Sequence, residues 1–360
     1  MPKQNILALR RCYHGGPDYA EFERLGIKPA DVLDFSSNSN PYPFVLEFTL
    51  NEAIIDHYPD SESTELRRLI ATQIGLAEDN VIIGAGSMEI IRLVAQAYLG
   101  RDDKTLILKP TFGEYEVACR IADAEIHELW AEECQQFRFD AKRCMATIAQ
   151  LKPKVVFICN PNNPTGQYFS ASELESIIVS VGKEGLAVID EAYIAFTEGS
   201  WDSIELIKRY HNLIIIRSMT KDFAMAGLRL GYGLGSLEII ENLNKVKPPW
   251  NVNAIAQLAG VQAKNDGAYI RRSGRQIRRN RDYLIAEIEA LGYTTLPTCT
   301  NFFLVRVGQA AVFRNRLLQY GIIVRDCTSF GLSEYVRMAP RSLPECHRLI
   351  QVLKTLVSKS

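Results

Sequence analysis

A lysine, an arginine and two hydroxyl side chains occur within the segment 217–232, Arg-Ser-Met-Thr-Lys-Asp-Phe-Ala-Met-Ala-Gly-Leu-Arg-Leu-Gly-Tyr. The preceding run Asn-Leu-Ile-Ile-Ile predicts a buried strand, which would deliver Ser218, Thr220 and Lys221 to its carboxyl end. Arg229 follows Lys221 by eight residues. Because ligands of open α/β sheets bind at the carboxyl ends of strands, these residues predict an anion site beside an amine. A lysine amine in a dry pocket can form a Schiff base, so we expect a ligand with both a carbonyl and an anionic group.

This segment resembles the cofactor-lysine segment of the fold-type I pyridoxal-phosphate enzymes, the aspartate aminotransferase superfamily. The cofactor expected from the resemblance is pyridoxal 5′-phosphate, which carries an aldehyde and a phosphate. The resemblance implies that Lys221 binds the aldehyde and that Ser218, Thr220 and Arg229 hold the phosphate. The other interpretation is a strand-to-loop turn with a surface lysine and a structural arginine, and the full spacing of the motif disfavours it.

Further residues match the superfamily in order and spacing over about residues 55–340. In Asp-Glu-Ala-Tyr, the resemblance implies that Asp190 keeps the cofactor ring nitrogen protonated and that Tyr193 donates to the ring oxygen. In Asn-Pro-Thr-Gly, Asn163 would contact the same oxygen. Three more matches are an aromatic residue on the ring, a glycine-rich helix start at the phosphate, and a tyrosine that reaches the cofactor of a second subunit. These are Phe112, then Gly86, Ser87 and Met88, and finally Tyr58.

Strand-like and helix-like segments alternate along the chain, which favours crossover connections and a mostly parallel sheet. The fold class expected is α/β, with a large domain whose central sheet is flanked by helices, plus a smaller α+β domain. The large domain is expected over residues 46–267, and the small one is expected from residues 1–45 and 268–360. Among the expected helices is a short one at residues 46–56.

Composition excludes several classes of protein. The chain has 360 residues, of which 47% are hydrophobic and 23% charged, and its formal net charge is −1. That charge favours neither nucleic acid nor an anionic membrane as a partner. Six arginines in residues 271–281 could form a nucleic-acid patch, but without interleaved aromatic residues we interpret them as a solvated helix face.

The eight cysteines and the apolar runs indicate a cytoplasmic protein. No apolar run reaches membrane length, and the N-terminal residues do not resemble a signal peptide. The cysteines lack paired spacing, which is typical of free thiols in a reducing compartment. Cys12 near His14, and Cys346 beside His347, also lack metal-ligand spacing, so no metal is expected.

Several short strings resemble threonine-phosphate decarboxylase, whereas the general pattern is similar to histidinol-phosphate aminotransferase. They are His-Gly-Gly at 14–16, Asp-Phe-Ser-Ser-Asn-Ser-Asn-Pro at 34–41, Arg-Ser-Met-Thr-Lys at 217–221, Pro-Trp-Asn-Val-Asn-Ala at 249–254 and Val-Arg-Asp-Cys at 324–327. The resemblance implies a substrate-anion site made by His14, Gly16, Asn38, Asn163, Arg325 and Arg337. The chain departs from the decarboxylase pattern at Tyr42-Pro43-Phe44, where Leu-Gly is usual, so phosphoserine rivals phosphothreonine as the substrate.

The expected function is therefore decarboxylation of an O-phospho-amino acid by a threonine-phosphate decarboxylase-type carboxy-lyase for cobamide synthesis. O-phospho-L-threonine would give aminopropanol phosphate, and O-phospho-L-serine would give ethanolamine phosphate. The alternative is a histidinol-phosphate-type aminotransferase that uses glutamate or 2-oxoglutarate, because in-plane clamping of a carboxylate by Arg337 would expose the α-hydrogen to Lys221. A non-catalytic regulator is disfavoured because residues before the core show no helix-turn-helix pattern. The resemblance also implies a homodimer, since Tyr58 would serve the other subunit.

Overall fold

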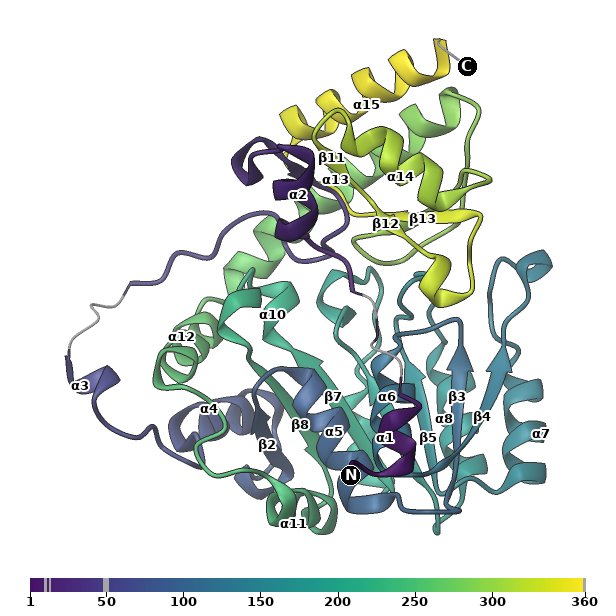
Figure 1. Ribbon diagram of the computed structural model, residues 1–360. Coiled ribbons are helices and arrows are strands. Elements are labelled where there is room, and N and C mark those ends of the chain that lie inside the picture. Colours follow the sequence, from purple (N-terminus) through teal and green to yellow (C-terminus); the bar gives the residue numbers. More distant parts are fainter. Residues whose placement is uncertain (10–11, 13, 48–51, 359–360) are drawn as a thin grey trace.

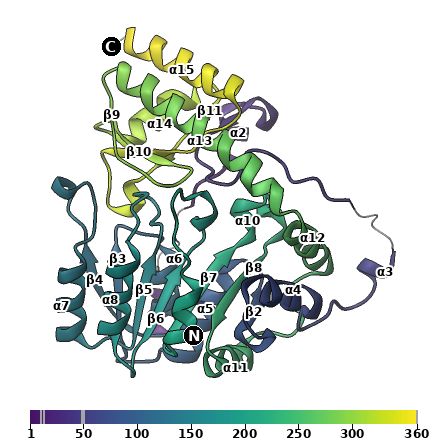
Figure 2. The ribbon, with the colours of Figure 1, turned by 180° about the vertical axis from the view of Figure 1, so that it is seen from behind.

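The computed structural model describes residues 1–9, 12, 14–47 and 52–358, which form two parts (Figure 1). The larger part is built around a long sheet, and the smaller part carries the C-terminal helix and covers the strand ends. Seen from behind, the long helix α13 (Gly267–Ala290) runs from the larger part into the smaller one (Figure 2). The two parts therefore enclose the carboxyl ends of the central strands between them.

The larger part contains a seven-stranded sheet among the described residues, in the order β2-β8-β7-β6-β5-β3-β4. Strand β8 pairs antiparallel with both neighbours, and the other pairs are parallel. The strands are β2 (Val81–Gly84), β3 (Lys104–Lys109), β4 (Glu125–Trp130), β5 (Val155–Cys159), β6 (Leu186–Asp190), β7 (Leu213–Ser218) and β8 (Gly231–Gly235). The expected α/β fold class with a mostly parallel sheet is confirmed.

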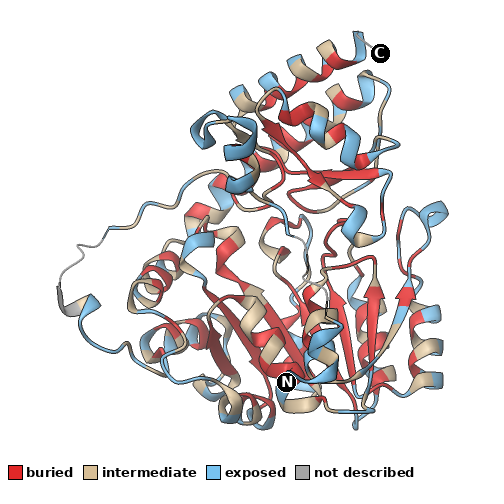
Figure 3. Cartoon of the chain, viewed as in Figure 1, coloured by how far each residue is buried: buried red, intermediate tan, exposed pale blue. Residues whose placement is uncertain are grey.

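The apolar runs seen in the sequence are strands that are buried on both faces (Figure 3). In β5, Val156 and Ile158 join one hydrophobic cluster, while Val155 and Phe157 join the cluster on the opposite face. Helices cover both faces, as parallel sheets require. One face carries α5 (Ser87–Tyr98), α6 (Glu114–Ile121) and α11 (Leu237–Val246). The other carries α4 (Thr64–Ile74), α7 (Ala141–Leu151), α8 (Ala171–Val181), α9 (Ile204–Arg209) and α12 (Ala254–Asn265).

The smaller part combines a four-stranded antiparallel sheet, in the order β12-β13-β10-β9, with helices. The N-terminal strand β1 (Leu33–Asp34) pairs in parallel with β11 (Ile322–Ile323), which ties the N-terminal segment to this part. Its other elements are α2 (Tyr19–Leu25), β9 (Thr294–Thr295), β10 (Phe303–Arg306), α14 (Ala310–Leu318), β12 (Arg325–Asp326), β13 (Tyr335–Met338) and α15 (Leu343–Ser358). Short 3₁₀ turns occur along the whole described chain; they are η1 (Pro29–Asp31), η2 (Glu78–Asn80), η3 (Glu133–Gln135), η4 (Ile194–Phe196), η5 (Ala226–Leu228) and η6 (Thr328–Phe330).

The helix expected at residues 46–56 is much shorter in the structure, where α3 (Glu52–Ile55) is its remnant. Residues 46–47 have no regular structure, and residues 48–51 lie outside the described part of the chain. The side chain of Ile55 is exposed, whereas Leu46 packs against the core outside any regular element.

The domain boundaries stay a prediction, and one N-terminal element lies apart from the smaller part. Helix α1 (Gln4–Leu7) lies against α6, where Asn5 Nδ2 donates to the carbonyl of Arg120 at 2.8 Å. Within the described residues, none of the helices combines the length and the apolar character needed to cross a bilayer.

Candidate active site

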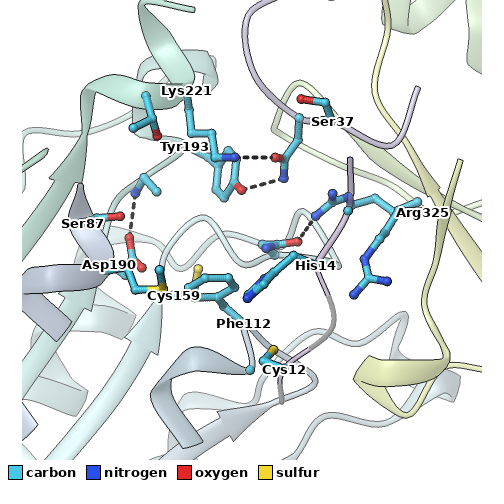
Figure 4. A pocket seen from close by; sticks show the side chains of 18 of the residues that line it. Cys12, His14, Ser37, Ser87, Phe112, Cys159, Asp190, Tyr193, Lys221 and Arg325 are labelled. Atoms are coloured by element: carbon cyan, nitrogen blue, oxygen red, sulfur yellow. Dashed lines mark hydrogen bonds between the residues drawn. The ribbon is translucent and has the colours of Figure 1, made fainter. Parts of the chain in front are cut away.

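A cavity of about 290 Å³ opens at the carboxyl ends of the central strands, between the sheet and the smaller part (Figure 4). Side chains reach it from the N-terminal segment, from the ends of β5 and β6, and from α10 (Met219–Asp222), which follows β7. Arg325 and Arg337 reach it from the smaller part. Residues far apart in the sequence thus converge where α/β sheets bind ligands.

Lys221 lies inside this cavity, one turn beyond the end of β7. Its Nζ donates to Asn38 Oδ1 at 3.1 Å, and Asn38 Nδ2 donates to the Tyr193 hydroxyl at 2.6 Å (Figure 4). Burial, followed by the nearby guanidinium of Arg337, lowers the pKa of Lys221 to about 8. A larger share of this amine is therefore neutral near pH 7 than for a lysine in water, which suits attack on a carbonyl.

Asp190 ends β6 with its carboxylate buried at the floor of the cavity. Its Oδ1 accepts from the backbone N–H of Ala192 at 3.0 Å, and its Oδ2 accepts from the hydroxyl of Tyr115 at 2.7 Å. Burial raises the pKa of Asp190 to about 6, against the effect of the Tyr115 hydrogen bond. A carboxylate in this place can hold a protonated ring nitrogen.

The start of α5 and the residues that follow β7 and η5 bring together hydrogen-bond donors that suit a phosphate. Gly86 has φ +84° and precedes α5, whose first turn has no side-chain cap. A Cβ on Gly86 would lie 3.0 Å from Arg229 Nη2, and a Cβ on Gly231 would lie 2.5 Å from the backbone nitrogen of Ser87. The two glycines thus let an arginine and a strand approach the helix start closely.

Two hydroxyls belong to the same group of donors. They are Ser218 Oγ and Thr220 Oγ1, which lie 2.5 Å apart. Ser87, Met88, Thr220 and Arg229 also line the cavity. Backbone N–H groups, hydroxyls and a guanidinium are the donor set that a phosphate requires. Together with the amine of Lys221 and the carboxylate on β6, these donors fit pyridoxal phosphate.

Phe112 and Asn163 lie in the cavity as expected for contacts with a cofactor ring. The ring of Phe112 lies 5.8 Å from that of His14, with an interplanar angle of 45°. Asn163 Oδ1 accepts a hydrogen bond from Arg337, which also donates to the carbonyl of Ser36 at 2.8 Å. The cavity therefore has an aromatic wall next to an amide and a buried guanidinium.

The expected substrate-anion residues lie around this cavity, except that Gly16 lines an adjoining cavity of about 130 Å³. The N–H of Gly16 donates to Ser36 Oγ at 2.9 Å. Arg325 is buried and donates to Ser329 Oγ at 2.7 Å. The amide of Asn38 contacts Lys221 and the hydroxyl of Tyr193.

His14 lies near two other groups that could bind a metal. The ligand atoms of Cys12, His14 and Glu114 all lie within 4.8 Å of one another. The carboxylate of Glu114 already accepts from His14 at 2.9 Å and from Arg92 at 2.7 Å. In this arrangement Glu114 links the N-terminal segment to α5.

Tyr58 lies outside the cavity of its own chain. Its side chain is 79% exposed, and its ring stacks on Trp250 with centroids 4.4 Å apart. An exposed tyrosine at this place can reach a second subunit, and its role there stays a prediction.

Several residues in the cavity wall or directly behind it were not predicted from the sequence. Cys159, Ser329 and Phe330 line the cavity, and Tyr115 lies behind Asp190. A signal existed for Tyr115, since it lies three residues after Phe112 at the start of a helix. Ser329 and Phe330 lie on η6, between β12 and β13, and their place in the cavity depends on the fold of the smaller part.

The chain matches a known protein family over most of its length. The family model for class I and II aminotransferases matches residues 30–353 of the chain. The chain belongs to this family. It is thereby a member of the fold-type I pyridoxal-phosphate superfamily, and the expected cofactor, pyridoxal 5′-phosphate, is confirmed.

Two curated relatives of this aminotransferase-family chain match it over almost its full length. Histidinol-phosphate aminotransferase of Moorella thermoacetica is 33% identical over 366 residues, covering 99% of this chain and 93% of the relative. Histidinol-phosphate aminotransferase 2 of Carboxydothermus hydrogenoformans is 32% identical over 353 residues, covering 96% of each.

Solved structures share the fold. Histidinol-phosphate aminotransferase from Clostridium acetobutylicum has a TM-score of 0.81 at 28% identity, covering 91% of this chain and 100% of that one. L-threonine-O-3-phosphate decarboxylase from Porphyromonas gingivalis has a TM-score of 0.77 at 25% identity, with the same coverage. Histidinol-phosphate aminotransferase from Sinorhizobium meliloti, solved with pyridoxal-5′-phosphate, has a TM-score of 0.85 at 20% identity, covering 98% of this chain and 97% of that one.

The expected decarboxylation of an O-phospho-amino acid is wrong. Eight curated relatives, 31–34% identical over 91–99% of the chain, carry the name histidinol-phosphate aminotransferase. The expected assignments as a carboxy-lyase and to cobamide synthesis depended on that reaction and are not supported. The misleading strings contribute His14, Asn38 and Arg325 to the cavity.

Proposed function

We propose that the chain is an aminotransferase that moves the amino group of histidinol phosphate, or of a closely related amino phosphate, to 2-oxoglutarate. The observation that carries this proposal is the match to the Moorella thermoacetica relative, which covers 99% of the chain. The cavity supports it, because two buried guanidinium groups, Arg325 and Arg337, lie in the same cavity as the amine of Lys221.

Pyridoxal phosphate, when bound, withdraws electrons from the substrate carbon that carries the amino group. Lys221 would take the proton from that carbon as a general base, and in a later step it would give the proton back as a general acid. Asn38 holds Lys221 Nζ at 3.1 Å and so fixes the direction of the amine. Asp190 would keep the ring nitrogen charged, while Tyr193 and Asn163 would hold the ring oxygen.

The anion site must accept two substrates in turn, because the amino donor has a phosphate and 2-oxoglutarate has two carboxylates. Guanidinium groups bind both kinds of anion through paired, charge-assisted hydrogen bonds. Histidinol phosphate has no carboxylate on its amino carbon, so proton removal by Lys221 is the step open to it. Arg325 and Arg337 would hold the anions, and Phe112 would form the wall behind the ring.

Incubation of the holoenzyme with histidinol phosphate and 2-oxoglutarate should give one glutamate for each histidinol phosphate consumed. Arg325→Ala should raise the KM for histidinol phosphate about ten- to a hundredfold, since charged hydrogen bonds to the phosphate are lost. Arg348→Ala changes an exposed arginine on α15 and serves as the matched control. Release of CO₂ from O-phosphothreonine without glutamate formation would contradict the proposal.

We further propose a homodimer in which Tyr58 binds the cofactor phosphate of the partner subunit. The ring of Tyr58 is exposed and does not line the cavity of its own chain, which supports this arrangement. Tyr58→Phe should weaken cofactor binding about tenfold, since one hydrogen bond to a charged group is lost. Tyr19→Phe, at another exposed tyrosine, should leave cofactor affinity unchanged. A fully active monomer in light scattering would overturn the dimer.

A further inference from the structure

Tyr115 lies beneath the candidate site without lining it. It belongs to the first turn of α6, and its side chain is completely buried. The hydroxyl donates to Asp190 Oδ2 at 2.7 Å, although 75 residues separate the two in the sequence. Tyr115 is absent from the cavity wall, and three of its neighbours, Asp190, Phe112 and Cys159, line the cavity. Its hydroxyl reaches the site through the hydrogen bond to Asp190.

The ring of Tyr115 is held in place by two other aromatic rings. It stacks on Phe157 of β5 with centroids 5.2 Å apart and an interplanar angle of 14°. Phe112 meets it edge-on, with centroids 5.7 Å apart. Rings packed in this way fix the position of the hydroxyl, which lies next to Asp190 at the end of β6 and to the thiol of Cys159 at the end of β5. Burial raises the pKa of Tyr115 well above its usual value, so the hydroxyl keeps its proton and stays a donor.

Asp190 depends on such donors for its charge. Burial raises its pKa to about 6, and the hydrogen bonds from Tyr115 and from the Ala192 N–H act against burial. Of the neighbouring charges, Glu191 on the same chain segment raises that pKa and Lys221 from α10 lowers it. These two donors occupy one position on each carboxylate oxygen, which fixes the plane of the group and leaves its other lone pairs for the cavity.

We propose that Tyr115 is a positioning residue, whose hydroxyl holds Asp190 in the orientation and the charged form that bind the ring nitrogen of the cofactor. This role rests on the proposed contact between Asp190 and the ring, and it is independent of which amino phosphate is the substrate. Without the hydroxyl, Asp190 would be a stronger base than it is in the wild-type protein. The ring nitrogen would then hold its proton less firmly, and the ring would withdraw electrons less strongly.

The variant Tyr115→Phe tests this role, because it keeps the stacked ring and removes one oxygen. The matched control is Tyr210→Phe, since the Tyr210 hydroxyl also donates to a carboxylate, Glu175 at 2.6 Å, outside the cavity. Cofactor labelled with ¹⁵N at the ring nitrogen is bound to each holoenzyme, and its chemical shift is recorded without any substrate. Tyr115→Phe should move the shift toward that of an unprotonated pyridine, while the control keeps the wild-type shift.

Two further measurements separate positioning from packing. In the protein without cofactor, the ¹³C titration of the Asp190 carboxyl should move to higher pH in Tyr115→Phe, which also serves if that variant binds cofactor poorly. In turnover, kcat should fall about ten- to a hundredfold with the KM values kept, as expected for loss of a hydrogen bond to a charged group. When Asp190→Asn is already present, adding Tyr115→Phe should lower kcat almost no further.

The proposal would be overturned if Tyr115→Phe kept both the ¹⁵N shift of the ring nitrogen and the titration of Asp190 found in the wild type. An equal loss of kcat in the Asp190→Asn background would also overturn it, since the effect would then pass through packing. Failure of the aminotransferase assay with histidinol phosphate would leave both spectroscopic readouts in place, because they need no substrate.

Discussion

Replacing Lys221 with alanine should abolish turnover and the visible absorption of the bound cofactor. The amine lies in the cavity with its pKa lowered to about 8, so it is the group there best suited to bind an aldehyde and to move a proton. Loss of a positioned acid–base group alone costs about 10²–10⁴-fold in rate, and the covalent hold on the cofactor is lost as well. Activity should therefore fall to background.

Two variants test whether this loss is specific to the amine. Lys221→Arg keeps a positive charge but stays protonated at working pH, so it should be equally inactive. Lys245→Ala removes a surface lysine on α11 that donates to Asn242, and it should behave as wild type. Borohydride reduction of wild-type holoenzyme followed by peptide mass analysis should place the cofactor on Lys221. Cofactor fixed in the same way in Lys221→Ala would show that another residue carries it.

The site could be predicted where residue type and strand position together define the chemistry. The run before Ser218 is a strand because β-branched residues buried on both faces favour a parallel sheet, and this places Lys221 at its carboxyl end. Asp190 was identified by its Asp-Glu-Ala-Tyr motif, and the structure places it at the end of β6. Strand β4 and helices α6 and α7 escaped prediction. In β4 the burial pattern is mostly exposed or intermediate, so the apolar run that marks the central strands is missing.

Contacts between distant segments could not be predicted in this way. The hydrogen bonds of Asn38 to Lys221 and Tyr193 join an N-terminal loop to the sheet, and residue type does not reveal which partner an amide will find. The choice between decarboxylation and amino transfer has a similar cause. The resemblance implies the same lysine, aspartate and arginines for both reactions, which would differ in the substrate bond that stands perpendicular to the cofactor ring.

Replacing Asp190 with asparagine should lower kcat about 10²–10³-fold, the range seen when one preorganised electrostatic contact is removed from an active site. The amide is neutral and cannot favour a protonated ring nitrogen, so the cofactor loses much of its electron-withdrawing power. Cofactor should still bind, because Lys221 and the donors around Arg229 remain. The ¹⁵N shift of the ring nitrogen should be that of an unprotonated pyridine.

Asp222→Asn provides the control for Asp190→Asn, since it changes a second carboxyl whose pKa burial raises, to about 7, on the same helix as Lys221. Its Oδ1 accepts from the N–H of Phe223 at 3.0 Å, and the residue does not line the cavity. The ring nitrogen in Asp222→Asn should therefore keep its wild-type ¹⁵N shift. If Asp190→Asn retained near wild-type activity with a protonated ring nitrogen, another group would have to supply the charge. Asp190 would then be a structural carboxylate at the end of β6, and the positioning role proposed for Tyr115 would be contradicted as well.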